Sequence, residues 1–494
     1  MIYIINIVNL KIYQYLISKK NEKYRVIVAT SGDTGGAVAN AFSLTDVPVT
    51  IFFPKNRISK FQEKQITNYG KNISCFSVDG SFDDCQKIVK ELLLDKDIEN
   101  KYKLITANSI NIARLIPQIF YYFISYSKLK RIYGKHLNSY KIIYSIPSGN
   151  FGNVTAGLIS KLLGLPIHKL LIATNSNNSL ENFFKEGIFK SKKSIDTISN
   201  AMDVGNPSNF QRLYYLCNED INIMKKYIIT DSVNDSDTKL TINEVYSKYN
   251  YLIDPHTAVG YKSIQNLENS HDKIKITLAT ASPFKFKEIV EDSIKKKLDY
   301  PQKFNDILNL QSYYLNYHSN NEDIFKRLIK DKIIILIGMP GSGKSTIAAN
   351  LSKKFDWTLI ETDNLIINKF KKKLVDIVND LKDKFTLEET DVILNIKDIK
   401  PYTVISTGGS VVYSQIAMDH LSKLGVIIHL DTNFHDIASR VKNYFERGIV
   451  IKNGETFLDL FNNRKTLYEK YRDLSVNNSI LDITATTNII NNLF

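Results

Sequence analysis

Short runs of apolar, mostly β-branched residues alternate along this chain with longer stretches in which apolar residues recur at helical spacing. The runs RVIVAT, PVTIFF, KIIYSIPSG, KLLIATN and KITLATA predict strands in the first part, and KIIILIG, TVISTGG and GVIIHLD predict strands in the second. Strands that alternate with helices usually form parallel sheets with helices on both faces. The pattern therefore predicts an α/β fold throughout.

One segment interrupts this alternation. Residues 311–331, QSYYLNYHSNNEDIFKRLIKD, are polar and aromatic without a strand signal, and a new strand–loop–helix unit starts directly after them. A chain of 494 residues is long enough for two cores. We therefore predict a first domain at 1–312, a linker at 313–331 and a second domain at 332–494.

Composition narrows the class of protein. The chain is 43% hydrophobic and 23% charged, as soluble globular proteins are. Its net charge of +14 comes from scattered lysines and arginines, so we expect phosphorylated small molecules rather than nucleic acid as partners. Cys75, Cys85 and Cys217 lack metal-binding spacing and are expected to be structural. Neither MIYIINIVNL nor the apolar stretch at 115–127 predicts a signal peptide or a membrane span, so we expect a cytoplasmic protein without membrane contact.

The strand-like run KIIILI is followed at once by GMPGSGKST, which satisfies the G-x-x-x-x-G-K-S spacing of a P-loop. Glycines let backbone N–H groups surround phosphate oxygens, and the next helix adds the positive end of its dipole. Lys344 is expected to reach the β- and γ-phosphates of ATP, and the Ser345 hydroxyl to bind Mg²⁺. A glycine-rich turn without a ligand is the alternative, which the full spacing disfavours. The predicted ATP-binding residues are Gly338, Met339, Pro340, Gly341, Ser342, Gly343, Lys344, Ser345 and Thr346.

The motif order GMPGSGKST, ETDNLI, STGGSVV and RKTLYEKY over residues 332–494 resembles the shikimate kinase family. The resemblance implies a P-loop kinase with an α/β/α fold and a lid, which phosphorylates a small metabolite. It implies catalytic roles for Lys344 and Asp363, with Asp363 holding the acceptor hydroxyl and Glu361 helping to place Mg²⁺. The further implied contacts are Gly408, Gly409 and Arg464 to the acceptor, Arg440 to the adenine, and Arg447, in the lid segment YFERGIVIKNGE, to the transferring phosphoryl group.

Taken singly, these residues have ordinary alternatives, because a carboxylate after a strand can cap a helix and an isolated arginine is often a surface charge. One departure concerns the acceptor. Where shikimate kinases have phenylalanine and then a shikimate-binding arginine, this chain reads KDKFTLEE, with Thr386 in the arginine's place, and Ser410 replaces a usual third glycine. Losing a charge-assisted contact costs about 1.5–3 kcal/mol. Shikimate and homoserine both remain candidate acceptors.

Residues 25–300 resemble threonine synthase, a pyridoxal-phosphate enzyme of fold type II. The resemblance rests on ATSGDTGGAVANAF, FPKNRISKFQEKQI, VDGSFDDC, ANSINIARLIPQ, PSGNFGN, AMDVGNPSNFQR, DPHTAVGY and LATASPFKF, which occur in family order. It implies that Gly149, Asn150, Phe151, Gly152 and Asn153 hold the cofactor's phosphate and that Thr280 lies at its pyridine nitrogen. It also implies that O-phosphohomoserine contacts Ser31, Asp33, Thr34, Asn108, Ser109, Asn111 and Arg114, and is converted to threonine and phosphate.

The family's cofactor-bound lysine lies in an F-K-D segment, and by alignment this chain starts at or just after that position. Lys11 is a poor substitute, since it lies in an apolar helical pattern close to SGDTG. We therefore expect the first domain to be catalytically incomplete as written. A divided gene, a start further upstream, or a non-catalytic binding or scaffold domain would each explain this, and a separate chain could supply the missing part. A further hypothesis is that the kinase makes O-phosphohomoserine from homoserine for its neighbour.

Overall fold

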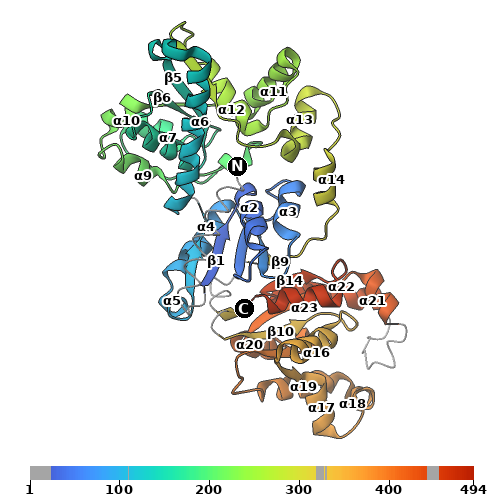
Figure 1. Ribbon diagram of the computed structural model, residues 1–494. Coiled ribbons are helices and arrows are strands. Elements are labelled where there is room, and N and C mark those ends of the chain that lie inside the picture. Colours follow the sequence, from blue (N-terminus) through green and yellow to red (C-terminus); the bar gives the residue numbers. More distant parts are fainter. Residues whose placement is uncertain (1–23, 109–110, 319–326, 329–330, 442–454, 494) are drawn as a thin grey trace.

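The computed structural model describes residues 24–108, 111–318, 327–328, 331–441 and 455–493. It has three stacked parts, with the β5–β8 sheet at one end, the strands β1–β4 in the middle and the strands β10–β14 at the other end (Figure 1). All eight runs expected to be strands contain one, and helices alternate with them. The α/β fold class is confirmed.

The first sheet lies in the part that includes residues 115–294. Its order is β7-β6-β5-β8, all parallel, with β5 (Lys141–Pro147), β6 (Ile167–Thr174), β7 (Ile228–Ser232) and β8 (Lys273–Thr277). The helices here are α6 (Leu115–Tyr133), α7 (Gly152–Leu162), α8 (Ser179–Glu186), α9 (Phe210–Tyr215), α10 (Ile221–Tyr227), α11 (Asp235–Tyr249), α12 (Pro255–Gln265) and α13 (Lys287–Ile294). In the described part of the chain, no helix has the length and hydropathy of a membrane span.

The second sheet runs through the middle and far parts of the molecule. Among the described residues it has ten strands, in the order β11-β12-β10-β13-β14-β9-β3-β2-β1-β4. Its strands are β1 (Tyr24–Ala29), β2 (Val49–Pro54), β3 (Ile73–Val78), β4 (Lys103–Thr106), β9 (Leu315–Tyr317), β10 (Ile333–Ile337), β11 (Thr358–Glu361), β12 (Thr403–Ser406), β13 (Val426–Asp431) and β14 (Leu474–Asn477). The pairing is parallel everywhere except between β14 and β9.

Helices cover both ends of this long sheet. Beside the strands β1–β4 lie α2 (Asp33–Phe42), α3 (Lys60–Thr67), α4 (Phe82–Leu94), α5 (Lys96–Lys101) and α14 (Gln302–Leu308). Beside the strands β10–β14 lie α16 (Lys344–Phe355), α17 (Thr362–Phe370), α18 (Leu374–Leu381), α19 (Phe385–Leu394), α20 (Gln415–Leu424), α21 (Phe434–Arg440), α22 (Phe457–Tyr471) and α23 (Ile483–Asn491).

The expectation that residues 311–331 contain no strand is wrong, because β9 lies there. Leu315 and Tyr317 are buried at 0% and 2% exposure, and the strand pairs with β3 on one side and β14 on the other. Three residues are too few to show an alternating pattern, and neighbours on both sides supply the pairing that a short strand cannot supply alone.

The two predicted domains share one hydrophobic core around β9. Phe52 and Phe76 from the first domain belong to the same buried cluster as Leu474 and Ile489 from the second. Polar contacts close the same seam, since the Arg25 guanidinium donates to the Leu493 carbonyl at 3.3 Å and the Ser74 hydroxyl donates to the Asn492 carbonyl at 2.7 Å. The domains are therefore joined by packing as well as by the chain.

Candidate functional site

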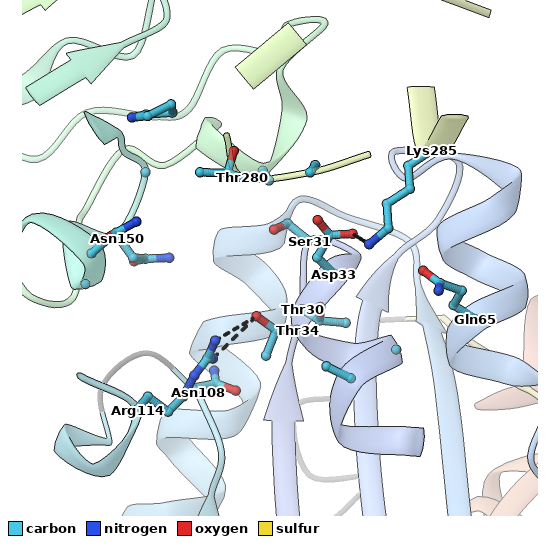
Figure 2. A pocket seen from close by; sticks show the side chains of 18 of the residues that line it. Thr30, Ser31, Asp33, Thr34, Gln65, Asn108, Arg114, Asn150, Thr280 and Lys285 are labelled. Atoms are coloured by element: carbon cyan, nitrogen blue, oxygen red, sulfur yellow. Dashed lines mark hydrogen bonds and ion pairs between the residues drawn. The ribbon is translucent and has the colours of Figure 1, made fainter. Parts of the chain in front are cut away.

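The largest set of predicted site residues meets in one cavity of about 1090 Å³ between the two sheets. Segments that follow β1, β4, β5 and β8 form its wall, as expected for ligand sites at the carboxyl ends of parallel strands. Figure 2 shows side chains from these separate segments pointing into the same space. The predicted residues that line it are Ser31, Asp33, Thr34, Asn108, Arg114, Gly149, Asn150, Phe151, Gly152, Asn153 and Thr280.

The loop at 149–153 forms a phosphate-sized cradle at the start of α7. Phe151 has a left-handed φ of 59° and precedes the first residue of the helix. Among the described residues, none of the backbone N–H groups from Gly149 to Asn153 donates a hydrogen bond within the protein. Unpaired donors at a helix N-terminus fit an anion such as the phosphate of pyridoxal phosphate.

The segment AMDVGNPSNFQR holds this loop in place. A Cβ added to Gly149 would lie 2.8 Å from the Ala201 carbonyl oxygen, so only glycine fits there. The Asn150 Oδ1 accepts from the Ser208 backbone N–H at 3.1 Å, and its carbonyl accepts from the Asn209 side-chain amide at 3.0 Å. These contacts explain why the two motifs occur together in the sequence.

Thr280 is supported by a buried network from the DPHTAVGY motif. Its backbone N–H donates to the Thr257 hydroxyl at 3.3 Å, and that hydroxyl donates to the Asp254 carboxylate. The other Asp254 oxygen contacts His256 Nδ1 at 2.9 Å, while His256 Nε2 accepts from the Ala201 N–H at 3.1 Å. The network therefore ties the Thr280 segment to the phosphate cradle, a link that sequence reasoning missed although the motif was visible.

A cationic subsite lies on the opposite wall. The Arg114 guanidinium donates to the Ala107 carbonyl at 3.1 Å and to the Thr34 hydroxyl at 3.4 Å (Figure 2). Burial lowers the pKa of Arg114 to about 10, so the side chain stays charged at neutral pH. Asn108 is fixed beside it, because its Oδ1 accepts from the Ala29 N–H at 3.0 Å. A buried arginine next to a hydroxyl is suited to a phosphate group.

Lys285 is a pocket residue that the sequence analysis did not single out. Its ammonium lies 2.7 Å from Asp33 Oδ1, and Gln62 donates to the same oxygen at 3.2 Å. Burial alone would raise the pKa of Asp33, but the charge and hydrogen bond of Lys285 hold it below its usual value. In the sequence, the SPFKF segment places this lysine three residues beyond a site motif. That spacing does not distinguish it from the other lysines of the chain.

One predicted residue of the first domain stands apart from this cavity. The Asn111 side chain donates to the Thr106 carbonyl at 3.0 Å and accepts from the Ala113 N–H at 3.0 Å, so it caps a short helix and is not among the lining residues. Ser109 and Lys11 lie outside the described residues. The other predicted residues meet at the cavity because the segments after several strand ends build its wall.

The second site surrounds the P-loop between β10 and α16. Gly338, Gly341 and Gly343 have φ values of 150°, 84° and 95°, which bring successive N–H groups to one side. The Lys344 ammonium donates to the Gly338 carbonyl at 2.7 Å and to the Met339 carbonyl at 3.0 Å. Burial lowers the pKa of Lys344 to about 8, although the Asp363 carboxylate opposes this. The loop therefore has the form needed for nucleotide phosphates, and the predicted residues Pro340, Ser342, Ser345 and Thr346 lie on it.

The predicted acceptor residues lie around Gly408 and Gly409. A Cβ on Gly408 would be 3.1 Å from Asp363 Oδ1, and one on Gly409 would be 3.1 Å from Arg464 Nη1. The Arg464 guanidinium lies over the Tyr413 ring, 5.2 Å from its centroid. Burial raises the pKa of Asp363, with the Lys344 charge opposing. An acid and an arginine thus flank one glycine turn.

Glu389 belongs to this cluster and was not predicted. It is 1% exposed, and its Oε1 would lie 2.3 Å from a Cβ on Gly408. Its Oε2 accepts from the Ser410 hydroxyl at 2.8 Å. Glu389 lies in the KDKFTLEE motif three residues after Thr386, but nothing in the motif indicates that this acid faces the glycine turn.

Two other residues predicted for the kinase, Glu361 and Arg440, lie at the rim of this site. The Glu361 carboxylate accepts from the Asn364 amide at 2.6 Å, at the start of α17. The Arg440 guanidinium donates to the Gly341 carbonyl at 3.4 Å on the exposed side of the P-loop. Arg447 lies outside the described residues. The contacts proposed for Mg²⁺ and adenine therefore stay predictions.

Three protein families match successive parts of the chain. Residues 7–278 match the family described as pyridoxal-phosphate dependent enzyme, and residues 257–329 match the threonine synthase C-terminal family. Residues 340–493 match the shikimate kinase family.

Individual relatives agree with the first match. A threonine synthase from Buchnera aphidicola subsp. Acyrthosiphon pisum is 41% identical over 300 residues, which cover 60% of this chain and 67% of the relative. The crystal structure of threonine synthase from Escherichia coli superposes with a TM-score of 0.56 at 38% identity, over 60% of this chain and 67% of that one. The yeast threonine synthase structure has a TM-score of 0.59 at 31% identity, over 67% of this chain and 75% of that one.

Proposed function

This chain belongs to the threonine synthase family of pyridoxal-phosphate-dependent enzymes and carries a shikimate kinase domain, and from this premise we propose that it is bifunctional. Its first cavity would bind pyridoxal phosphate and O-phosphohomoserine, and its P-loop site would bind ATP, Mg²⁺ and a small acceptor with a hydroxyl group. The observation that carries the proposal is the meeting of cofactor and substrate motifs in the one cavity between the sheets.

In the first cavity, the chain's own residues would fix two phosphates at opposite walls. The free N–H groups from Gly149 to Asn153 suit the phosphate of the cofactor, and Thr280 suits its ring nitrogen with a neutral hydroxyl. The bound cofactor would supply an electron sink for removing protons from the substrate. Arg114 and Thr34 would hold the substrate phosphate. Turnover to threonine would further require the family's cofactor-bound lysine, for which Lys11 is a poor substitute.

In the second site, Lys344 would exchange its backbone carbonyl partners for the β- and γ-phosphates of ATP. Ser345 and Glu361 would hold Mg²⁺. Asp363 would accept the proton of the acceptor hydroxyl, and a raised pKa makes its carboxylate a better base. Arg464 would bind a carboxylate of the acceptor, since guanidinium and carboxylate pair with two parallel hydrogen bonds.

A second candidate is a linked pair of reactions in which the kinase supplies the other site with its substrate. Thr386 favours this alternative over shikimate, because it stands where a shikimate-binding arginine is expected. Homoserine carries a carboxylate for Arg464 and a primary hydroxyl for Asp363. Its phosphorylation would produce O-phosphohomoserine on the same chain as the cavity that would use it.

The proposal is tested on the full chain with two assays. One measures phosphate release from O-phosphohomoserine after loading with pyridoxal phosphate, together with cofactor absorbance as a measure of binding. The other measures ADP formed from ATP and Mg²⁺ with shikimate or homoserine. Cofactor binding without phosphate release would favour a non-catalytic binding domain. A failure to form ADP with either shikimate or homoserine would contradict the proposed kinase.

A further inference from the structure

Glu389 is a buried acid with one oxygen that no group of the described protein satisfies. It lies on α19, is 1% exposed, and its Oε2 is occupied by the Ser410 hydroxyl at 2.8 Å. Its Oε1 is fully buried and makes no hydrogen bond to any described residue. A buried, unpaired carboxylate oxygen is costly, so its retention indicates a partner that arrives from outside.

The free oxygen is directed into the acceptor site. A Cβ built on Gly408 would come within 2.3 Å of Glu389 Oε1 and 3.1 Å of Asp363 Oδ1, so both acids face the same turn. The next residue, Gly409, would place its Cβ 3.1 Å from Arg464 Nη1. Consecutive residues of one turn therefore separate two acids from one arginine, in the space where the acceptor is proposed to bind.

Glu389 makes no ion pair within the described residues, although the charges of Arg464 and Lys344 act against the burial that raises its pKa. The Lys344 ammonium is turned onto the Gly338 and Met339 carbonyls. Arg464 lies over the Tyr413 ring, and its Nε donates to the Tyr413 hydroxyl at 3.3 Å. Thr386, three residues earlier on the same face of α19, brings no charge. One Glu389 oxygen therefore remains, within the described residues, available to a positive group.

Burial, more than its neighbours, raises the pKa of Glu389 to about 7, with Asp363 adding to the rise and Arg464 opposing it. An arriving cation would stabilise the ionised form. A purely structural role is the alternative, in which Glu389 only positions Ser410. That role uses Oε2 alone and leaves Oε1 unexplained.

We propose that the kinase acceptor is an amino acid with a side-chain hydroxyl, whose ammonium group binds Glu389 while its carboxylate binds Arg464. This rests on the proposed kinase function and names the acceptor class for that site. The acceptor oxygen attacks the γ-phosphorus of ATP, the bond from that phosphorus to the β-γ bridging oxygen breaks, and ADP leaves. The hydroxyl proton passes to the Asp363 carboxylate, so the charges and atoms balance.

The test compares two acceptors that differ only in the ammonium group. Homoserine and 4-hydroxybutyrate have the same carbon chain, carboxylate and hydroxyl, and shikimate serves as the third acceptor. With the full chain, ATP and Mg²⁺, we expect kcat/KM for homoserine to exceed that for 4-hydroxybutyrate by about tenfold or more, the scale of a charge-assisted hydrogen bond. This comparison needs no variant and does not depend on one folding.

The matched variants are Glu389→Gln and Glu388→Gln. Glu388 precedes Glu389 on α19 but pairs with Lys369 at 2.7 Å, away from the glycine turn. Glu389→Gln is expected to raise KM for homoserine about tenfold while changing that for 4-hydroxybutyrate little, because only the ammonium contact is lost. Glu388→Gln is expected to leave both values unchanged.

Each other outcome is decisive. Equal use of homoserine and 4-hydroxybutyrate, a preference for shikimate, or an equal loss for both acceptors in Glu389→Gln would overturn the assignment of the ammonium group. Those results would still show a working kinase. A failure to form ADP with any of the three acceptors would instead overturn the proposed kinase function.

Discussion

The Lys285 ammonium lies 2.7 Å from the Asp33 carboxylate, although 252 positions separate the two residues in the sequence. Asp33 begins α2 beside the second sheet, and Lys285 follows β8 of the first sheet. The ion pair therefore connects the two walls of the cavity, and only 13% and 23% of the two side chains are exposed. A contact of this kind holds the site together before any ligand binds.

Removing this partner is expected to destabilise the chain. In Lys285→Met, Asp33 keeps its burial without a countercharge, so we expect a loss of about 1–3 kcal/mol in unfolding free energy. In the native chain the lowered pKa of Asp33 stabilises the fold above about pH 4, and this stabilisation is lost as the pH falls through that pKa. In the variant the pKa of Asp33 rises instead. The fold is then destabilised as the pH rises through the raised pKa and the buried carboxyl ionises. Urea unfolding at several pH values measures both, and Lys239→Met, which breaks an exposed pair, is the control.

The cationic wall of the cavity gives a second prediction. Arg114→Lys keeps a charge but loses the two-armed contact with Thr34 and the Ala107 carbonyl. We expect it to weaken O-phosphohomoserine binding about tenfold, and Arg114→Ala to weaken it further. Calorimetric titration of the cofactor-loaded chain measures this. Unchanged affinity in Arg114→Ala would place the substrate phosphate elsewhere in the cavity.

Restoring an arginine on α19 should change acceptor preference. Thr386→Arg places a guanidinium three residues from Glu389 on the same helix face, where it can neutralise that acid and bind a carboxylate. We expect activity with shikimate to rise and activity with homoserine to fall, each about tenfold. Leu387→Arg is the control, because Leu387 is 69% exposed and would add the same charge on the outer side. A similar effect of both variants would indicate net charge as the cause.

The pH dependence of the kinase should reveal Glu389. Its pKa of about 7 means that it becomes ionised as the pH rises through neutrality, so kcat/KM for homoserine should rise over that range. Asp363, Arg464 and Lys344 are the charged groups that act on Glu389, and the raised pKa of Asp363 affects every acceptor alike. The rise specific to homoserine, measured against 4-hydroxybutyrate, should disappear in Glu389→Gln. Its persistence would assign the titration to Asp363.

Separating the domains should cost stability because they share a core. A fragment of residues 332–494 would lack β9 and would expose Leu474 and Ile489, which pack against the first domain. We expect its melting temperature to be at least about 5 °C below that of the second domain in the full chain. A fragment of residues 313–494 keeps β9, and its melting temperature should lie between those of the shorter fragment and of the second domain in the full chain. Equal melting temperatures for all three would show that the shared core contributes little.

Much of the fold was visible in the sequence because its strands are long and buried. Runs such as KIIILIG and KIIYSIPSG are apolar on both faces, which a parallel strand covered by helices requires. The P-loop and the cradle at 149–153 were equally visible, since a phosphate cradle is built from consecutive residues whose glycines must be present in the sequence. The strand β9 was not, because three residues have no readable period and its pairing comes from β3 and β14.

The sequence alone therefore determined the elements whose chemistry is local: the parallel strands, the two glycine loops and the order of the motifs. Only the tertiary structure decided which distant side chains face each other. It paired Lys285 with Asp33, buried one Glu389 oxygen with no partner among the described residues, and removed Asn111 from the cavity wall. The reason is physical, because the partner and burial of a side chain depend on the residues that folding brings around it, and spacing along the chain does not encode them.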